Sequence, residues 1–279
     1  MFLRPRTLSE AVAALETPGV QILAGGTDFY PAMGERSASA PILDITAVPE
    51  LSGIRIGADE IRIASRTTWS EIIGAPLPRS FDALKAAARE VGSIQIQNRG
   101  TVGGNLCNAS PAADGMPPLL ALDAEVELAS KAGTGRLPLA SFITGNRKTA
   151  RRTNELLTAI IVPRRIDGPS AFLKLGARRY LVISIAMVAA ILEEDGQGKV
   201  AQARVAVGAC SAVAQRLPEL ERALIGAPFA AGIGRLVEPS HLAPLSPIDD
   251  VRATAAYRRD SARTLVARAL EQCVAERAR

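Results

Sequence analysis

Apolar residues recur along the chain at two spacings, one typical of helices and the other of strands. Val12 and Leu15 stand at helical spacing behind a Thr-x-x-Glu capping box, which predicts a helix over residues 8–16. Isoleucines alternate with polar residues over residues 53–65, and this pattern predicts a two-stranded hairpin with one buried face. Further helices are predicted from residue 69 and over residues 81–92, 216–226 and 249–279. Further strands are predicted over residues 20–26, 41–45, 154–163, 170–176, 183–195 and 200–211, and residues 117–130 are predicted as a short helix followed by a strand.

The order of these elements indicates the fold class and the domain organisation. Strands and helices are segregated rather than strictly alternating, which favours an α+β architecture. The sequence RRIDGP, residues 164–169, has the charges and chain-breaking residues of a linker. We therefore expect two domains, residues 1–165 and residues 169–279.

The composition argues for a globular protein and against a membrane protein. Of the 279 residues, 48% are apolar, which is ample for a buried core. The longest nearly apolar run, residues 180–192, is interrupted by Ser184 and is shorter than the about 20 residues that a membrane-spanning helix needs. The N-terminus lacks the pattern of a secretory signal. We expect no membrane span and a cytoplasmic location.

Cysteine and histidine are too few and too scattered for the common metal and hydrolytic sites. Cys107, Cys210 and Cys273 form no CxxC pair, so they encode neither a disulfide framework nor a cysteine-ligated metal cluster. His241 is the only histidine, which argues against a His-rich metal site and against a Ser-His-Asp triad. We therefore assign no catalytic residue and no metal ligand.

The net charge of the chain is +5, and its arginines often stand in pairs. A basic excess is compatible with nucleic acid, an acidic partner or an anionic cofactor, and paired arginines are also common on solvated surfaces. The one Trp, three Tyr and six Phe are not interleaved with the arginines, as a single-strand binding surface would require. We expect no binding of nucleic acid.

Two polar segments with paired glycines are the candidates for chemistry. They read LAGGTDFYP from residue 23 and TVGGNLCNASPAADG from residue 101. Glycine allows a positive φ and leaves no Cβ to keep a ligand away from backbone amides. A lone Gly-Gly pair is also typical of a simple turn. If the two pairs face one another, they would grip a pyrophosphate between consecutive N–H groups. Neither segment has Rossmann or P-loop spacing, so a dinucleotide here requires another fold.

Together, these segments resemble the FAD-binding medium subunit of the molybdenum hydroxylases, the family of xanthine dehydrogenase and aerobic carbon monoxide dehydrogenase. The sequences GNRKTARRTNELLTAIIVP, AFLKLGARR and SPIDDVRATAAYRR continue the resemblance in order and spacing. The resemblance implies an FAD domain of the vanillyl-alcohol-oxidase-like (PCMH) type and a smaller C-terminal α+β domain of the carbon monoxide dehydrogenase flavoprotein type. Some relatives of this FAD domain link the flavin to a histidine. The only histidine here, His241, lies far in sequence from both glycine segments, so we expect non-covalent FAD.

The resemblance also implies the cofactor-binding residues. They are Leu23, Ala24, Gly25, Gly26, Thr27, Asp28 and Phe29 in the first segment, Gly100, Thr101, Gly104, Asn105, Cys107, Asn108 and Asp114 in the second, and Leu156, Leu157 and Lys174 beyond them. Other interpretations stay open for four of these. Asp28 and Asp114 are also suited to Asx turns, Cys107 to packing, and Lys174 to a strand with a solvated amine.

The resemblance implies an electron-transfer function. A large partner subunit would carry the molybdenum cofactor, a small one would carry 2Fe-2S clusters, and this chain would pass electrons through FAD to an external acceptor. Many members of the family have an acid where this chain has Leu181 or Val182, which argues against NAD and leaves dioxygen, a quinone or another carrier open. The alternatives are a stand-alone FAD-binding protein and a self-contained flavin oxidoreductase.

Overall fold

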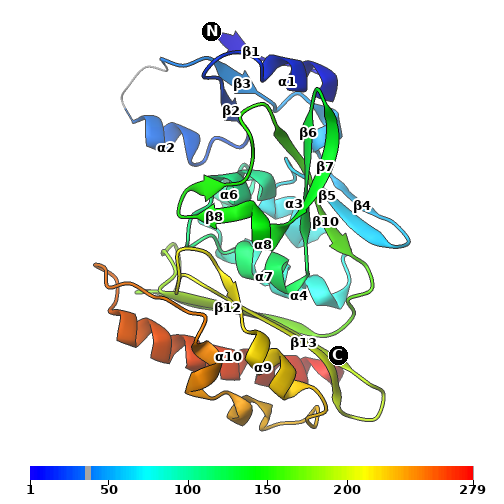
Figure 1. Ribbon diagram of the computed structural model, residues 1–279, viewed down its shortest axis with the longest axis vertical. Coiled ribbons are helices and arrows are strands. Elements are labelled where there is room, and N and C mark those ends of the chain that lie inside the picture. The colour runs from blue at the N-terminus through cyan, green and yellow to red at the C-terminus, as the bar shows by residue number, and fades with distance from the viewer. Residues whose placement is uncertain (35–38, 279) are drawn as a thin grey trace.

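The first residues form a small parallel sheet at one end of the computed structural model, which describes residues 1–34 and 39–278 (Figure 1). This N-terminal layer contains β1 (Phe2–Leu3), α1 (Leu8–Ala14), β2 (Gln21–Leu23), α2 (Phe29–Met33), β3 (Ile42–Asp44) and the 3-10 helix η1 (Pro49–Leu51). Strand β3 lies between β1 and β2. Ala11 of α1, Leu43 of β3 and Leu51 of η1 share one buried cluster, which holds the layer together.

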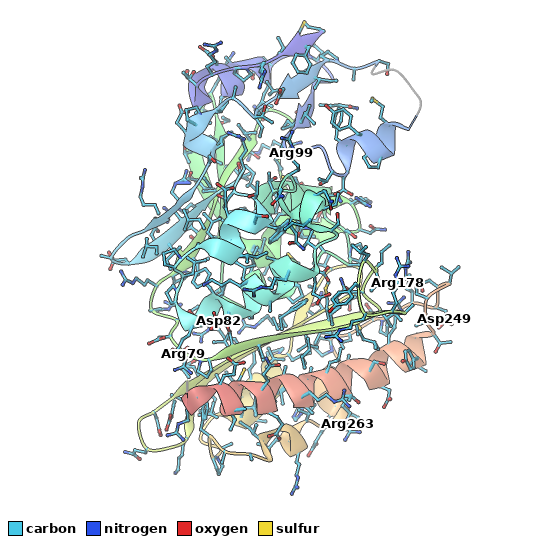
Figure 2. The ribbon with its side chains drawn as sticks, turned by 180° about the vertical axis from the view of Figure 1, so that it is seen from behind. Arg79, Asp82, Arg99, Arg178, Asp249 and Arg263 are labelled. Carbon is cyan, nitrogen blue, oxygen red and sulfur yellow. The ribbon has the colours of Figure 1, made fainter. Side chains whose placement is uncertain are left out.

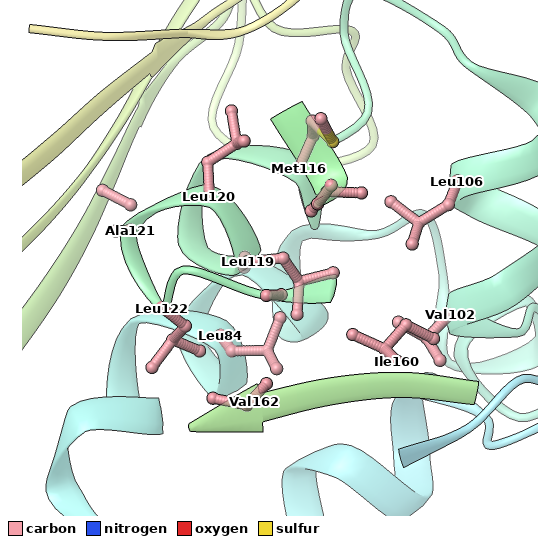
Figure 3. Close-up of a cluster of buried hydrophobic side chains, with 14 of the residues drawn as sticks. Leu84, Val102, Leu106, Met116, Leu119, Leu120, Ala121, Leu122, Ile160 and Val162 are labelled. Atoms are coloured by element: carbon pink, nitrogen blue, oxygen red, sulfur yellow. The ribbon is translucent and has the colours of Figure 1, made fainter. Parts of the chain in front are cut away.

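A five-stranded antiparallel sheet with several short helices forms the middle region. Its elements are β4 (Ile54–Ile56), β5 (Glu60–Ala64), α3 (Trp69–Gly74), η2 (Arg79–Phe81), α4 (Asp82–Glu90), α5 (Ile94–Gln97), α6 (Val102–Asn108), α7 (Met116–Ala121), β6 (Glu125–Ser130), β7 (Gly133–Pro138), α8 (Leu139–Phe142), β8 (Ile143–Gly145), β9 (Lys148–Thr149) and β10 (Leu156–Pro163). The strand order is β4-β5-β10-β6-β7. Figure 3 shows side chains of α4, α6, α7 and β10 gathered in the core of this region.

A four-stranded antiparallel sheet forms the C-terminal region, in the order β11-β12-β13-β14. Its elements are β11 (Ser170–Leu175), β12 (Ala186–Glu194), β13 (Val200–Gly208), β14 (Gln215–Arg216), α9 (Pro218–Leu224), η3 (Ile233–Leu236), η4 (Pro239–Leu242), α10 (Ala255–Ala275) and η5 (Glu276–Ala278). The sheet lies between helices of the middle region and α9 and α10 (Figure 1). Along β12, Met187 and Ala189 belong to the core of the middle region, whereas Val188 and Ala190 belong to the core under α10. Burial of both faces accounts for the continuous apolar sequence of this strand.

The expected α+β segregation is therefore observed, and the predicted hairpin forms as β4 and β5. Residues 102–108 were expected within a polar loop but form helix α6. Thr101 caps this helix by accepting a hydrogen bond from the Gly104 amide, and Val102 and Leu106, one helical turn apart, are both buried. Tertiary packing thus overrides the poor helix propensity of two glycines.

Other elements also differ from the prediction, and two of them are informative. Strand β7 pairs with β6 but is mostly exposed, so it lacks the apolar pattern that identifies a strand. The C-terminal helix begins behind its N-cap, Thr254, rather than at residue 249, and the last residue of the predicted helix, Arg279, lies outside the described residues. Among the helices that the structure describes, none is both long and apolar enough to cross a membrane.

Candidate functional site

A cavity of 580 Å³ lies between the N-terminal layer and the middle region. This volume is within the about 300–1,000 Å³ usual for ligand and cofactor sites. Its wall brings together the two glycine segments, which are far apart in sequence, and the start of β10. Of the residues predicted to bind a cofactor, the wall contains Ala24, Gly25, Gly26, Thr27, Asp28, Phe29, Gly100, Thr101, Gly104, Asn105, Cys107, Asn108, Leu156 and Leu157.

The first glycine pair makes a close approach possible between two segments of the wall. A methyl group on Gly25 would lie 2.0 Å from the carbonyl oxygen of Arg99, where the N-terminal layer meets the middle region (Figure 2). Gly26 has a φ of +79°, which favours glycine. No described residue accepts a hydrogen bond from the amides of Gly25, Gly26 and Thr27. These three N–H groups are therefore available to an anionic ligand.

The second glycine pair is built differently, and this corrects the expectation that both pairs offer free amides. The Gly103 amide donates to the Ser65 carbonyl over 2.9 Å, and the Gly104 amide donates to the Thr101 hydroxyl over 3.0 Å. A methyl group on Gly103 would lie 2.6 Å from the same Ser65 oxygen. Gly103 thus allows close packing of α6 against the end of β5, and its amide is not free to donate to a ligand.

Two polar groups of the wall have no protein partner. The hydroxyl of Ser65 and the side-chain oxygen of Asn105 are buried and accept or donate no hydrogen bond within the described chain. Buried polar atoms are usually paired, because an unpaired one costs about 1–3 kcal/mol. Both residues line the cavity, but the two unpaired atoms are themselves covered by the protein and are not open to a ligand there.

Asp28 lies on the wall but shows no Asx-type contact. It is the N-cap residue of α2, yet its side chain makes no capping hydrogen bond, and it is exposed. The interpretation as an Asx-turn residue therefore does not hold for Asp28. A carboxylate here places negative charge close to the free amides of the first glycine segment.

Three predicted residues lie away from the wall. Leu23 is buried beneath it, and its carbonyl accepts a hydrogen bond from the Ile45 amide. Asp114 and Lys174 form a buried ion pair instead, with 2.7 Å between Nζ and Oδ2, and the Ser184 hydroxyl donates to the other carboxylate oxygen over 2.6 Å. Asp114 is thus no Asx-turn residue, and the amine of Lys174 is not solvated.

Two protein families match nearly the whole chain. The family described as the FAD binding domain in molybdopterin dehydrogenase matches residues 1–165, and the CO dehydrogenase flavoprotein C-terminal domain matches residues 171–273. The chain belongs to the FAD-binding subunits of the molybdopterin dehydrogenases. The expected fold, an FAD-binding part followed by a C-terminal part of the carbon monoxide dehydrogenase flavoprotein type, is confirmed.

Individual relatives of this flavin subunit cover most or nearly all of its length. The nicotinate dehydrogenase FAD-subunit of Eubacterium barkeri is 35% identical over 82% of this chain and 80% of the relative. The putative xanthine dehydrogenase FAD-binding subunit of Escherichia coli is 31% identical over 98% and 96%. The solved structure of carbon monoxide dehydrogenase from Hydrogenophaga pseudoflava matches with a TM-score of 0.90 and 29% identity, covering 98% of this chain and 96% of that one.

The wall suits FAD on the observations above. Its open amides fit a diphosphate, and its apolar residues, Leu156 and Leu157 among them, fit a flat ring. The Cys107 thiol is exposed to the cavity, and desolvation within the concave wall raises its pKa to about 11. The thiol is therefore largely protonated at physiological pH. His241 belongs to η4, outside the wall.

Some residues of the flavin subunit's wall were not predicted. Ser65, Trp69 and Arg151 line the cavity, and none belongs to a glycine motif that sequence alone would single out. The two positions at which many family members have an acid, Leu181 and Val182, do not belong to this wall. Leu181 is exposed with a φ of +52°, and Val182 lines a second cavity, of 430 Å³, beside Lys174.

Proposed function

We propose that this chain is the electron-transfer subunit of a hetero-oligomeric molybdenum hydroxylase. In this proposal it takes electrons from the 2Fe-2S clusters of a small partner subunit and passes them to an external acceptor, while a large partner subunit carries the molybdenum cofactor and the substrate. The observation that carries the proposal is the cavity in which both glycine segments meet. It is supported by the similarity of 98% of the chain to a putative xanthine dehydrogenase FAD-binding subunit.

In the proposed site, the residues of the chain bind and orient FAD, which supplies one- and two-electron transfer when bound. The amides of Gly25, Gly26 and Thr27 would donate to the diphosphate. Thr101 would act by shaping α6, because its hydroxyl already accepts the Gly104 amide. The other predicted wall residues would line the cofactor. Leu23 would hold the first glycine segment in position from beneath. The Asp114–Lys174 ion pair would hold the second glycine segment in position from behind the wall.

The chemistry of the wall favours electron transfer over a self-contained flavin oxidoreductase. Asp28 and Arg151 are its charged side chains among the described residues, and they come with neutral amides, hydroxyls and apolar groups. An oxidoreductase that activates its own organic substrate needs a positioned acid or base over the flavin. The wall is instead suited to holding a cofactor.

Copurification tests this function. The chain would be tagged in its native host, purified under mild conditions, and its partners identified by mass spectrometry together with the molybdenum, iron and flavin contents. We expect two other chains at constant stoichiometry, with molybdenum, iron and FAD eluting together. A chain that elutes alone with FAD and without either metal would contradict the proposal and would support a stand-alone FAD-binding protein.

A further inference from the structure

Arg151 is the one basic side chain on the described wall of the large cavity. It stands in the segment between β9 and β10 and is half-buried. Apart from Asp28, the wall around it offers only groups that are uncharged at neutral pH. A dinucleotide with an anionic diphosphate would therefore meet a single cation in this cavity.

The guanidinium of Arg151 is fixed at one end and open at the other. Its Nη1 donates to the carbonyl oxygens of Glu155, over 2.7 Å, and Arg152, over 3.1 Å. Neither its Nη2 nor its Nε donates to an acceptor among the described residues, and no described carboxylate forms an ion pair with it. A positioned guanidinium with unused donors is the usual arrangement for recognition of phosphate.

From this arrangement we propose that Arg151 pairs with the diphosphate of the bound FAD. The inference rests on the proposed function, since it assigns a residue of the same site. The amides of Gly25, Gly26 and Thr27 are neutral donors, and the nearby Asp28 carboxylate repels an anion. Taking a diphosphate out of water into this cavity is costly unless a cation offsets its charge. Arg151 supplies that charge, and its open edge supplies charge-assisted hydrogen bonds.

Arg152 provides a matched control in the adjacent position. Its side chain is 81% exposed, it forms an ion pair with Glu155, and it does not line the cavity. The two arginines contribute equally to the net charge of the chain. A difference between their variants therefore reports on the site rather than on the overall field of the protein.

The test compares Arg151→Met, Arg151→Lys and Arg152→Met in the protein as purified from its host, stripped of flavin. Dissociation constants for FAD, ADP and adenosine would be measured by flavin fluorescence and by competition, at low and high salt, beside the Tm of each apoprotein. For Arg151→Met we expect FAD and ADP to bind about tenfold more weakly, the effect of one charge-assisted hydrogen bond, with adenosine unchanged and a weaker dependence on salt. Arg152→Met should match the wild type.

Three results would overturn the inference. They are an equal effect of the two methionine variants, an equal loss for adenosine and ADP, and an Arg151→Lys variant of normal Tm that binds ADP no better than Arg151→Met. Wild-type protein that binds neither FAD nor ADP would contradict the proposed function itself, and the inference would fall with it.

Discussion

Lys174 and Asp114 form a buried ion pair that joins the C-terminal sheet to the segment between α6 and α7. Their side chains are 7% and 9% exposed, and Nζ lies 2.7 Å from Oδ2. Desolvation raises the pKa of Asp114, against the opposing effects of Lys174 and the Ser184 hydroxyl. Because burial of a charge is costly, removal of either partner would leave the other as an uncompensated buried charge. It ties the position of β11 to the second glycine segment.

Replacing Lys174 by Met should lower the free energy of unfolding by about 3–5 kcal/mol, because it leaves the Asp114 carboxylate buried without a counter-charge. Urea unfolding of the apoprotein measures this change. Lys131→Met is the control, since Lys131 is exposed and only loosely paired with Glu16. Adding Asp114→Asn to Lys174→Met should recover part of the loss. A Lys174→Met variant as stable as Lys131→Met would show that the pair is not a structural link.

Gly25→Ala should weaken FAD binding about tenfold or more, because the new methyl group would collide with the Arg99 carbonyl and push two segments of the wall apart. Gly74→Ala is the matched control, as a methyl group on Gly74 would have no atom within 4 Å. Titration of apoprotein with FAD compares the two variants. Equal affinities would mean that the close approach at Gly25 does not shape the site.

Gly103→Ala should destabilise the protein even without FAD, by about 1–3 kcal/mol, since its methyl group would be forced against the Ser65 carbonyl. Thermal or urea unfolding of the apoprotein is the measurement. If Gly103 instead contacted the cofactor directly, the variant would keep the stability of the wild-type apoprotein and lose only the additional stability that FAD confers.

The contacts of Asp250 predict that the stability of the C-terminal region falls in acid. The Arg252 amide, followed by the Arg258 guanidinium 2.7 Å away, lowers the pKa of Asp250 from 3.8 to about 2. A lowered folded-state pKa contributes stability above the ordinary pKa, and this stability is lost as the pH falls through about 2. Wild type should therefore exceed Asp250→Asn in stability at neutral pH, and the difference should shrink between about pH 4 and pH 2. A difference independent of pH would contradict this assignment.

The apolar pattern predicted the fold wherever burial repeats along an element. Strand β12 was predicted because both of its faces are covered, and the hairpin of β4 and β5 because only one is. Helix α6 was not predicted, because it contains two glycines and two asparagines, and its apolar pattern is limited to Val102 and Leu106, one turn apart. Such an element is set by packing against distant residues, which no local pattern records.

Local sequence patterns are equally unable to predict those parts of the site that depend on packing between distant segments. Most residues of the two glycine segments that were predicted to bind FAD lie on the cavity wall, and these segments have a recognisable local sequence. The position of Lys174 depends on how β11 lies against the middle region, and its partner Asp114 is distant in sequence. Arg151 and Ser65 are single residues without a motif, so only the folded chain shows that they face the cavity.

Cys107 offers the most direct test of the claim that FAD occupies this cavity. It is the one exposed cysteine of the three, and it lies on the wall, while Cys210 and Cys273 are buried. Stripped protein would be treated with a thiol reagent at alkaline pH, because the pKa of the Cys107 thiol is raised to about 11. We expect one thiol per chain to react ahead of the two buried ones, and to be protected in proportion to FAD occupancy. Modification of Cys107 at an unchanged rate in protein saturated with FAD would place the cofactor elsewhere and contradict the account.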